Sequence, residues 1–568
     1  MKLSGAEIIW ESLIREGCAL VFGYPGGAIL PTYDALTKYP QIHHVLSRHE
    51  QGATHMADGF ARASGQVGVV IATSGPGATN LVTGIATAMM DSSPIVCLTG
   101  QVARSAIGTD AFQETDVTGI TLPITKHNYL VGDVRELAAT IREAFHIART
   151  GRPGPVLIDI PKDVQIEETE FEYPTDEIRL PGYRPMLAAS DDEVQKAVEM
   201  IGESKKPLIL AGHGVLMSGA VSELKAFAEA AQIPVALTLL GKGAISEHHP
   251  LCLGMMGMHG EACVNNAIQE ADLLLAFGMR FDDRVTGALE TYAPKSRKIH
   301  VEIDPSEINK NVEVDLGIVG DLKGVLGQLL PLVHRPSNPE WMEEIHRWKQ
   351  DTFERDVINE DGKDKLLAAH VISDLWKYTG GNATTVTDVG QHQMWEAQYY
   401  PHARPRTLIT SGGLGTMGFG LPAAIGAKMA SPEEEVWAIV GDGGFQMTMC
   451  ELATAVQERV EVKIAIVNNG YLGMVRQWQE FFYEERYSAT PLISPDFCKL
   501  AEAFGIPSIR VTQRDQVESA VAEARAHKGG PMLIDFVVEK HDVVYPMVPA
   551  GATLNEMIRR PTATPEMV

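Results

Sequence analysis

Two short glycine-rich segments in the last third of the chain carry residues that could bind a phosphate and a metal ion. They are Gly441-Asp442-Gly443-Gly444 and Asn468-Asn469-Gly470, and each directly follows an apolar run. Such runs predict buried parallel strands, and α/β sheets bind ligands where these strands end. Glycines let the backbone approach a phosphate closely, and a helix after Asp442 would offer free N–H groups. The oxygens of Asp442 and Asn469 suit Mg²⁺, which completes its shell with water and diphosphate oxygens.

Each segment alone is also a common turn sequence, and two unrelated turns are the simpler interpretation of either one. Both segments follow their own strand, however, and they are separated by a helical pattern. This strand–loop–helix–strand–loop order favours one site over two turns. The pair resembles the diphosphate- and metal-binding motif of the thiamin-diphosphate enzymes, in which Gly-Asp-Gly is followed after a spacer by Asn-Asn.

Glu50 is the candidate for acid–base chemistry, because it follows an apolar strand and precedes the helical run Gln51–Arg62. A carboxylate at this place is equally typical of a solvated acid at a helix start. A zinc site formed by His49, Glu50 and His55 is disfavoured, because the two histidines are not on one face of a helix.

Composition indicates an ordinary water-soluble globular protein. The 568 residues are 45% apolar and 21% charged, which predicts about three domains with ample core. The net charge of −25 disfavours nucleic acid and anionic membranes as partners. The six cysteines form no CxxC pair, the start of the chain resembles no leader peptide, and no apolar run is long enough to span a membrane. We therefore expect a cytoplasmic protein with free thiols.

Strand and helix patterns alternate along the whole chain, which predicts an α/β protein with three doubly wound parallel-sheet domains. We expect an N-terminal domain over residues 1–185, a central domain over 186–345 and a C-terminal domain over 346–568. The acidic, proline-bearing segments 166–190 and 331–364 are interpreted as a linker and a connector between them.

Further motifs narrow the resemblance to one family over nearly the whole chain. They are Phe22-Gly23-Tyr24-Pro25-Gly26-Gly27-Ala28, Arg48-His49-Glu50-Gln51, Thr73-Ser74-Gly75-Pro76-Gly77-Ala78-Thr79-Asn80, Gly108-Thr109-Asp110-Ala111-Phe112-Gln113-Glu114, Gly151-Arg152-Pro153-Gly154-Pro155-Val156, Arg280-Phe281-Asp282-Asp283-Arg284-Val285-Thr286-Gly287, Val389-Gly390-Gln391-His392-Gln393-Met394-Trp395 and Ser411-Gly412-Gly413-Leu414-Gly415-Thr416-Met417-Gly418. The chain resembles the large catalytic subunits of the acetohydroxyacid, or acetolactate, synthases.

The resemblance implies a complete thiamin-diphosphate site. In that family a glutamate at the place of Glu50 bonds the cofactor's aminopyrimidine ring and promotes loss of the thiazolium C2 proton. Gly27 and Gln113 would face the reacting carbon. Asp442, Asn469 and the Tyr471 carbonyl would bind Mg²⁺. The remaining cofactor contacts would be Thr73, Pro76, Asn80, Val389, Gly390, Gln391, His392, Gly415, Met417, Gly441, Gly443, Gly444, Leu472, Gly473 and Met474.

The resemblance also implies a non-redox FAD in the central domain, although the residues there form no GxGxxG fingerprint. Its contacts would be Arg152, Gly212, His213, Gly214, Thr238, Leu239, Met258, His259, Gly278, Arg280, Asp282, Arg284, Glu302, Ile303 and Asp321. Phe112 and Lys162 would line the substrate channel, and Trp478 would favour 2-ketobutyrate as the acceptor. Without the resemblance, Met417 and Phe112 are equally well explained as core, Lys162 as a solvated charge and Trp478 as helix packing.

The implied reaction decarboxylates pyruvate and joins the two-carbon unit to pyruvate or 2-ketobutyrate. The implied assembly is a homodimer or tetramer, with a small regulatory subunit as a further partner. Two alternatives stay open: a pyruvate-oxidase-type flavoprotein, in which FAD does redox work, and a non-catalytic nucleotide-binding protein.

Overall fold

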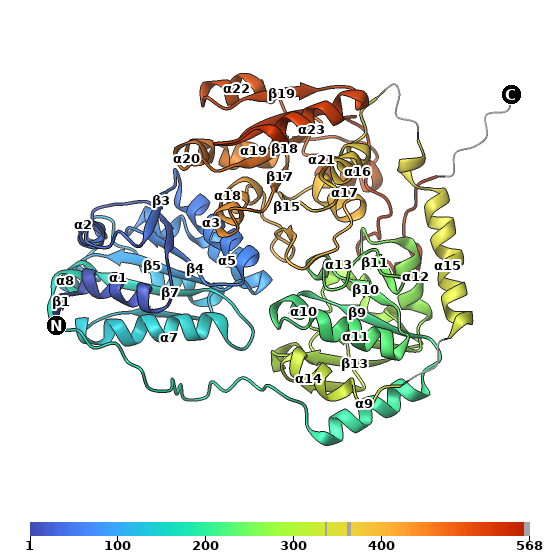
Figure 1. Cartoon of the computed structure of the whole chain (residues 1–568), viewed down its shortest axis with the longest axis horizontal. Helices are drawn as coiled ribbons and strands as arrows, with labels where there is room; N and C mark the ends of the chain where they lie inside the picture. The colour runs from blue at the N-terminus through green and yellow to red at the C-terminus, as the bar shows by residue number, and fades with distance from the viewer. Residues whose placement is uncertain (335–337, 361–364, 562–568) are drawn as a thin grey trace.

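The computed structural model describes residues 1–334, 338–360 and 365–561. Within them, three six-stranded sheets follow one another along the chain, and every strand pair inside these sheets is parallel. Figure 1 shows the first unit in blue, the second in green and the third in orange and red, with helices packed around each sheet. The predicted α/β class with three parallel sheets is confirmed.

The first sheet has the order β3-β2-β4-β5-β7-β6. Its strands are β2 (Leu20–Gly23), β3 (His43–Leu46), β4 (Gly68–Ala72), β5 (Ile95–Gln101), β6 (His127–Leu130) and β7 (Val156–Pro161). The central strands β4, β5 and β7 are buried along their whole length, as their continuous apolar runs predict.

The third sheet repeats this connectivity, with the order β16-β15-β17-β18-β20-β19. Its strands are β15 (Thr384–Thr387), β16 (Leu408–Ile409), β17 (Val436–Gly441), β18 (Val462–Asn468), β19 (Ser508–Val511) and β20 (Met532–Val537). In both sheets the strand order reverses beside the first strand of the unit, which is where such sheets bind ligands.

The central sheet differs, with the order β11-β10-β9-β12-β13-β14. Its strands are β9 (Pro207–Ala211), β10 (Val235–Leu237), β11 (Cys252–Met255), β12 (Leu273–Phe277), β13 (Arg297–Glu302) and β14 (Leu316–Val319). Numbered within the unit, this is the 3-2-1-4-5-6 order of dinucleotide-binding folds, whose ligand crevice opens between the first and fourth strands.

The first and third units share one hydrophobic core. Helix α3 (Glu50–Ser64) packs on α18 (Gly420–Ala430), and glycines let the two backbones touch. A Cβ on Gly59 would lie 2.1 Å from the carbonyl oxygen of Ala423, and a Cβ on Gly426 would lie 1.9 Å from that of Met56. The helix that carries Glu50 is therefore fixed against the C-terminal unit of its own chain.

Two segments interpreted as linkers contain regular structure. Strand β8 (Glu168–Glu170) pairs with β1 (Lys2–Ser4), and helix α15 (Pro339–Glu354) begins behind the cap Asn338. The α15 sequence is mostly charged, but Trp341 is only 2% exposed and packs with Ile345 in the central unit's core. The predicted 345/346 domain boundary falls inside this helix. Residues 335–337 and 361–364 of the connector lie outside the described residues.

Cys97, Cys252 and Cys263 are buried free thiols, whereas Cys450 is exposed. Among the described residues, no helix combines the length and the apolar character needed to cross a membrane.

Candidate functional site

The phosphate-type site lies where β15, β17 and β18 end side by side. Asp388, the residue directly after β15, holds the surrounding loops of this site in place. Its buried carboxylate accepts the backbone N–H groups of Val389 at 2.9 Å, of Gly418 at 3.0 Å and of Gly420 at 2.8 Å. Burial raises the pKa of Asp388 to about 6 in spite of these bonds. This carboxylate ties together the loops that carry Val389 and Met417.

Glycines in this site are required by close contacts. A Cβ on Gly444 would lie 2.1 Å from Oδ1 of Asp388, and one on Gly441 would lie 2.8 Å from the ring of His392. At Gly473, a Cβ would lie 2.1 Å from Oε1 of Gln391. These contacts leave a small cleft that is lined in part by glycine backbone, which a diphosphate can approach closely.

Asp442 and Asn469 lie together at this cleft. Asp442 begins helix α19 (Asp442–Thr448), and Ser494 donates to its Oδ2 at 3.1 Å. Burial raises the pKa of Asp442 to about 6. The Tyr471 N–H donates to Oδ1 of Asn469 at 3.1 Å, and Nδ2 of Asn469 donates to Gln391 at 3.2 Å. A single buried carboxylate with a neutral amide fits a cation that brings phosphate oxygens with it.

His392 also faces the cleft, and its Nε2 is buried without a hydrogen-bond partner in the described residues. Burial lowers the pKa of His392 to about 3, so its ring is neutral. A buried, unpaired ring nitrogen costs free energy unless a ligand satisfies it. The glycine cradle, the oxygen pair and this nitrogen together fit thiamin diphosphate with Mg²⁺.

A second, much larger cavity of about 1090 Å³ opens at the crevice of the central sheet. Gly214 follows β9 and Gly278 follows β12, and a Cβ on Gly278 would lie 2.6 Å from the Cα of Gly214. Glu302 ends β13, and burial raises its pKa to about 7. The strand order, the paired glycines and an acid at the end of a strand fit a dinucleotide such as FAD.

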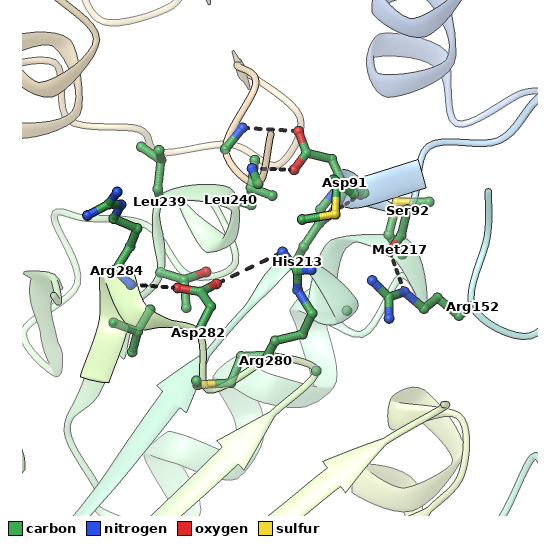
Figure 2. A pocket seen from close by; sticks show the side chains of 18 of the residues that line it. Asp91, Ser92, Arg152, His213, Met217, Leu239, Leu240, Arg280, Asp282 and Arg284 are labelled. Atoms are coloured by element: carbon green, nitrogen blue, oxygen red, sulfur yellow. Dashed lines mark hydrogen bonds and ion pairs between the residues drawn. The ribbon is translucent and has the colours of Figure 1, made fainter. Parts of the chain in front are cut away.

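All three units contribute to the wall of this cavity (Figure 2). Arg152 of the first unit donates to Ser92 at 2.9 Å and forms ion pairs with Asp304 at 3.2 Å and Glu307 at 2.8 Å. In the same wall, Asp91 accepts the N–H groups of the loop that begins at Gly412 and the buried guanidinium of Arg62. The loop that leads to Met417 is thus anchored on the first unit.

The two cavities meet at five residues that line both: Val389, Gly390, Met417, Met474 and Val475. Met417 is half-buried between them, so it is not ordinary core. Trp478 lies on α21 (Gly473–Phe482), is half-buried and lines the large cavity beside Met474. Its ring also packs on Phe482, with the centroids 5.2 Å apart.

The structure brings most of the expected FAD and diphosphate residues together. Every expected FAD residue except Gly212 lines the large cavity, and Gly212 is the residue before α10 (His213–Met217). The expected cofactor residues from Val389 to Met474 line one cavity or the other. This grouping is consistent with the assignments, which stay predictions.

The residues expected from the first unit lie elsewhere. Glu50, Thr73, Pro76 and Asn80 line neither cavity. They form their own cluster, in which Nδ2 of Asn80 donates to Glu50 at 2.9 Å and Ala28 N–H donates to Thr73. A Cβ on Gly77 would lie 3.3 Å from Oε1 of Glu50. Within one chain, the cluster around Glu50 is therefore separate from both cavities.

Gly27, Phe112 and Lys162 are exposed, and Gln113, which follows Phe112, is half-buried with a left-handed φ of 60°. Phe112 is 88% exposed, so the alternative that it belongs to the core is wrong. None of the four lines either of the two cavities described above.

Sequence reasoning missed Asp388, Asp91, Ser92 and Gln393. Asp388 had a usable signal, because it directly follows a strand and precedes Val389. Asp91 ends a helix and becomes part of the cavity only through contacts distant in sequence.

His49 caps α3 by accepting the Gln51 N–H, and the described residues contain no metal-type His, Cys and acid cluster.

Three family models match the chain in succession. They are the thiamine pyrophosphate enzyme N-terminal TPP binding domain over residues 3–120, the central domain over 194–329 and the C-terminal TPP binding domain over 388–536.

Curated relatives extend the match over nearly the whole chain. The acetolactate synthase large subunit of Corynebacterium glutamicum is 49% identical over 98% of this chain and 90% of its own length. A probable acetolactate synthase large subunit of Methanocaldococcus jannaschii is 48% identical over 98% and 95%. The acetolactate synthase of Arthrospira platensis is 47% identical over 98% of both chains.

Proposed function

The chain belongs to the acetolactate synthases, within the thiamine pyrophosphate enzymes, and from this premise we propose how its residues carry out the reaction. It decarboxylates pyruvate and joins the two-carbon unit to pyruvate or 2-ketobutyrate, giving 2-acetolactate or 2-aceto-2-hydroxybutyrate for branched-chain amino-acid synthesis. The observation that carries the proposal is the glycine cradle with Asp442, Asn469 and the unpaired His392 nitrogen at three adjacent strand ends.

The chain's own residues hold the cofactor and position one proton. Asp442, Asn469 and the Tyr471 carbonyl would hold Mg²⁺ against the diphosphate, and Met417 would support the bend between the two rings. When bound, thiamin diphosphate supplies the electron sink for the carbanion that decarboxylation leaves. Glu50 would hold a proton on the aminopyrimidine ring and so promote loss of the proton at thiazolium C2.

The direct test is carbon dioxide release from pyruvate by the purified protein. We expect release that requires both thiamin diphosphate and Mg²⁺. Asp442 and Asn469 carry no positive charge, so the diphosphate is neutralised only when Mg²⁺ is bound between them. Release that persists after both are removed by dialysis against a chelator would contradict the proposal. A chain that binds both and releases nothing would support the non-catalytic alternative instead.

We propose that the active unit is a homodimer in which Glu50 of one chain serves the cradle of the other. This arrangement is supported by the position of Glu50, Thr73, Pro76 and Asn80, which line neither of the two cavities within one chain. Large apolar side chains are exposed in both units: Phe112 and Leu122 in the first, and Met447, Val475 and Ile493 in the third. Exposed apolar groups of this kind mark an interaction surface, and two-fold symmetry would complete two sites at once.

Mixing two inactive variants tests this arrangement. Glu50→Gln and Asp442→Ala chains, dissociated and reassociated together, should recover about a quarter of wild-type activity. Half of randomly formed dimers are mixed, and each mixed dimer has one intact site out of two. If both residues served the same chain's site, no mixture would exceed the activity of the separate variants. Mixing either variant with itself is the control.

The acceptor site is proposed to include Trp478. Replacing Trp478 by leucine should abolish the preference for 2-ketobutyrate and spare acetolactate formation. The acceptors differ by one methylene, for which an apolar pocket discriminates by about 10–200-fold. Competing the two acceptors and measuring both products gives the ratio. An unchanged ratio with a much lower melting temperature would show that Trp478 acts only in helix packing.

The acid and arginine residues at Arg280–Arg284 support FAD binding in the large cavity, and we propose that this FAD is structural. The purified protein should be yellow, and reconstitution with the redox-inactive 5-deaza analogue should leave product formation largely intact. Reconstitution of the same protein with FAD is the matched control. Loss of activity with the analogue would favour the pyruvate-oxidase alternative.

Two features of the cellular setting complete the proposal. The large-subunit relatives suggest a small regulatory partner, and the acidic surface and free thiols fit a cytoplasmic location. Co-purification of the chain with a small subunit encoded in the same genome would test the first.

A further inference from the structure

Glu451 of the C-terminal unit is a fully buried carboxylate that reaches into the N-terminal unit. Its Oε1 accepts the backbone N–H groups of Arg48 at 3.1 Å and His49 at 3.0 Å. Its Oε2 accepts the Arg48 N–H at 3.1 Å and the Thr454 hydroxyl at 2.6 Å. Each of its oxygens is therefore bonded, and two of the donors are the backbone groups directly before Glu50.

The carboxylate lies against the first turn of helix α3. A Cβ on Gly52 would lie 2.3 Å from Oε1 of Glu451, so only glycine admits this approach. A negative charge at a helix N-terminus is favourable, because it meets the positive end of the helix dipole and unpaired N–H groups. The acid thus fixes both the position and the direction of the turn on which Glu50 lies.

Neighbouring contacts make this a defined junction. The Thr454 hydroxyl is also 3.3 Å from the Leu46 carbonyl oxygen, and the Arg48 guanidinium donates to that carbonyl at 2.8 Å and to Gln457 at 2.8 Å. At the start of β3, His43 pairs with Glu458 at 2.8 Å. The strand–helix connection that carries Glu50 is held throughout by the segment around Glu451.

The same segment begins at the phosphate cradle. Helix α19 starts at Asp442 and is followed by a 3₁₀ turn, Met449–Glu451, and by α20 (Leu452–Gln457). One continuous stretch therefore has the proposed metal ligand at its start and the Glu50 anchor at its end.

We propose that Glu451 is a positioning residue that orients Glu50 for proton transfer at the cofactor by anchoring the backbone before it. This inference rests on the proposed function of Glu50. In the proposed dimer, Glu451 would connect the cradle of one chain to the glutamate that serves the partner's cofactor.

The first measurement needs no cofactor. Hydrogen–deuterium exchange of the full-length apo protein should show faster exchange at the Arg48 and His49 amides in Glu451→Gln than in wild type. The amide side chain keeps the shape but offers one acceptor oxygen instead of two. Glu458→Gln is the matched control, because it removes a pairing between the same two units without touching these amides. Unchanged protection in Glu451→Gln would overturn the proposal.

The second measurement follows deuterium exchange at thiazolium C2 in the loaded protein by NMR. Glu451→Gln should slow this exchange about tenfold, because a charge-assisted anchor is replaced by a weaker one. Thiamin diphosphate affinity and melting temperature should stay near wild type, and Glu451→Asp should recover part of the rate. Glu451→Gln could show a wild-type rate of C2 exchange although its Arg48 and His49 amides exchange faster than in wild type. This result would show that the anchor is only structural.

The controls separate this inference from the proposed function. If wild type itself fails to bind thiamin diphosphate or to exchange C2, the proposed function is wrong. If wild type exchanges and Glu451→Gln matches it, only the role of Glu451 is wrong. If Glu451→Gln does not fold, both measurements are made on Glu451→Asp. Faster exchange at the Arg48 and His49 amides of Glu451→Asp together with a wild-type rate of C2 exchange would overturn the proposal.

Discussion

Replacing Glu50 by glutamine is expected to slow proton exchange at thiazolium C2 by about 10²–10⁴-fold, which is the range of general acid–base catalysis. An amide of the same shape cannot share a ring proton as a carboxylate does. The fold should survive, because Nδ2 of Asn80 can still donate to the remaining oxygen and α3 keeps its packing on α18. We expect turnover to fall with the exchange rate.

The measurement is C2 deuterium exchange by NMR, with cofactor affinity and a melting curve on the same sample. Glu458→Gln is the control, because it alters an acid near the same junction that contacts neither Glu50 nor Asn80. Exchange at the wild-type rate in Glu50→Gln would remove Glu50 from the mechanism. A large loss of thiamin diphosphate affinity with normal exchange would make Glu50 a binding residue only.

Replacing Asp442 by alanine is expected to weaken Mg²⁺ and thiamin diphosphate together, by about 100-fold or more. Loss of an outer partner of a metal ligand already costs about 10–100-fold, and Asp442 is the proposed ligand itself. Without this carboxylate the cation binds more weakly, and the negative charge of the diphosphate is then less neutralised in a partly dry site. Titration of thiamin diphosphate with and without excess Mg²⁺ measures both effects, and unchanged affinity would refute the metal assignment.

Asp442 also predicts a pH dependence in the wild-type protein. Burial raises the pKa of Asp442 to about 6. Protons therefore compete with Mg²⁺ for this carboxylate at a higher pH than they would for an ordinary aspartate. Mg²⁺ affinity should be constant above this value and fall about tenfold per pH unit below it. In Asp442→Ala the dependence should disappear, which separates this carboxylate from His392 and other groups.

The parts of the fold that were predictable are those with a local signal. Strands β4, β17 and β18 are mostly apolar runs, and β17 and β18 end in Gly441 and Asn468. Their position at a ligand-binding edge follows from parallel-sheet geometry. Helix α15 lacked such a signal, because two buried side chains in a charged segment look like a solvated connector.

Long-range contacts explain what was missed in the site. Asp91 reaches the Gly412 loop across more than half of the chain, and Glu451 reaches Arg48 across a comparable separation. No spacing rule connects such residues. The motifs around Glu50 and Asp442 were visible in the sequence, but the position of Glu50 outside both cavities, on a helix packed against α18, was not.

The carbon balance of the reaction distinguishes joining of two pyruvates from oxidative decarboxylation of one. The protein, loaded with thiamin diphosphate, Mg²⁺ and FAD, is supplied with labelled pyruvate and an artificial electron acceptor, and all products are quantified. We expect one carbon dioxide and one 2-acetolactate for every two pyruvates consumed, with the artificial electron acceptor left oxidised. Carbon dioxide released together with a two-carbon acid and reduced acceptor would contradict it.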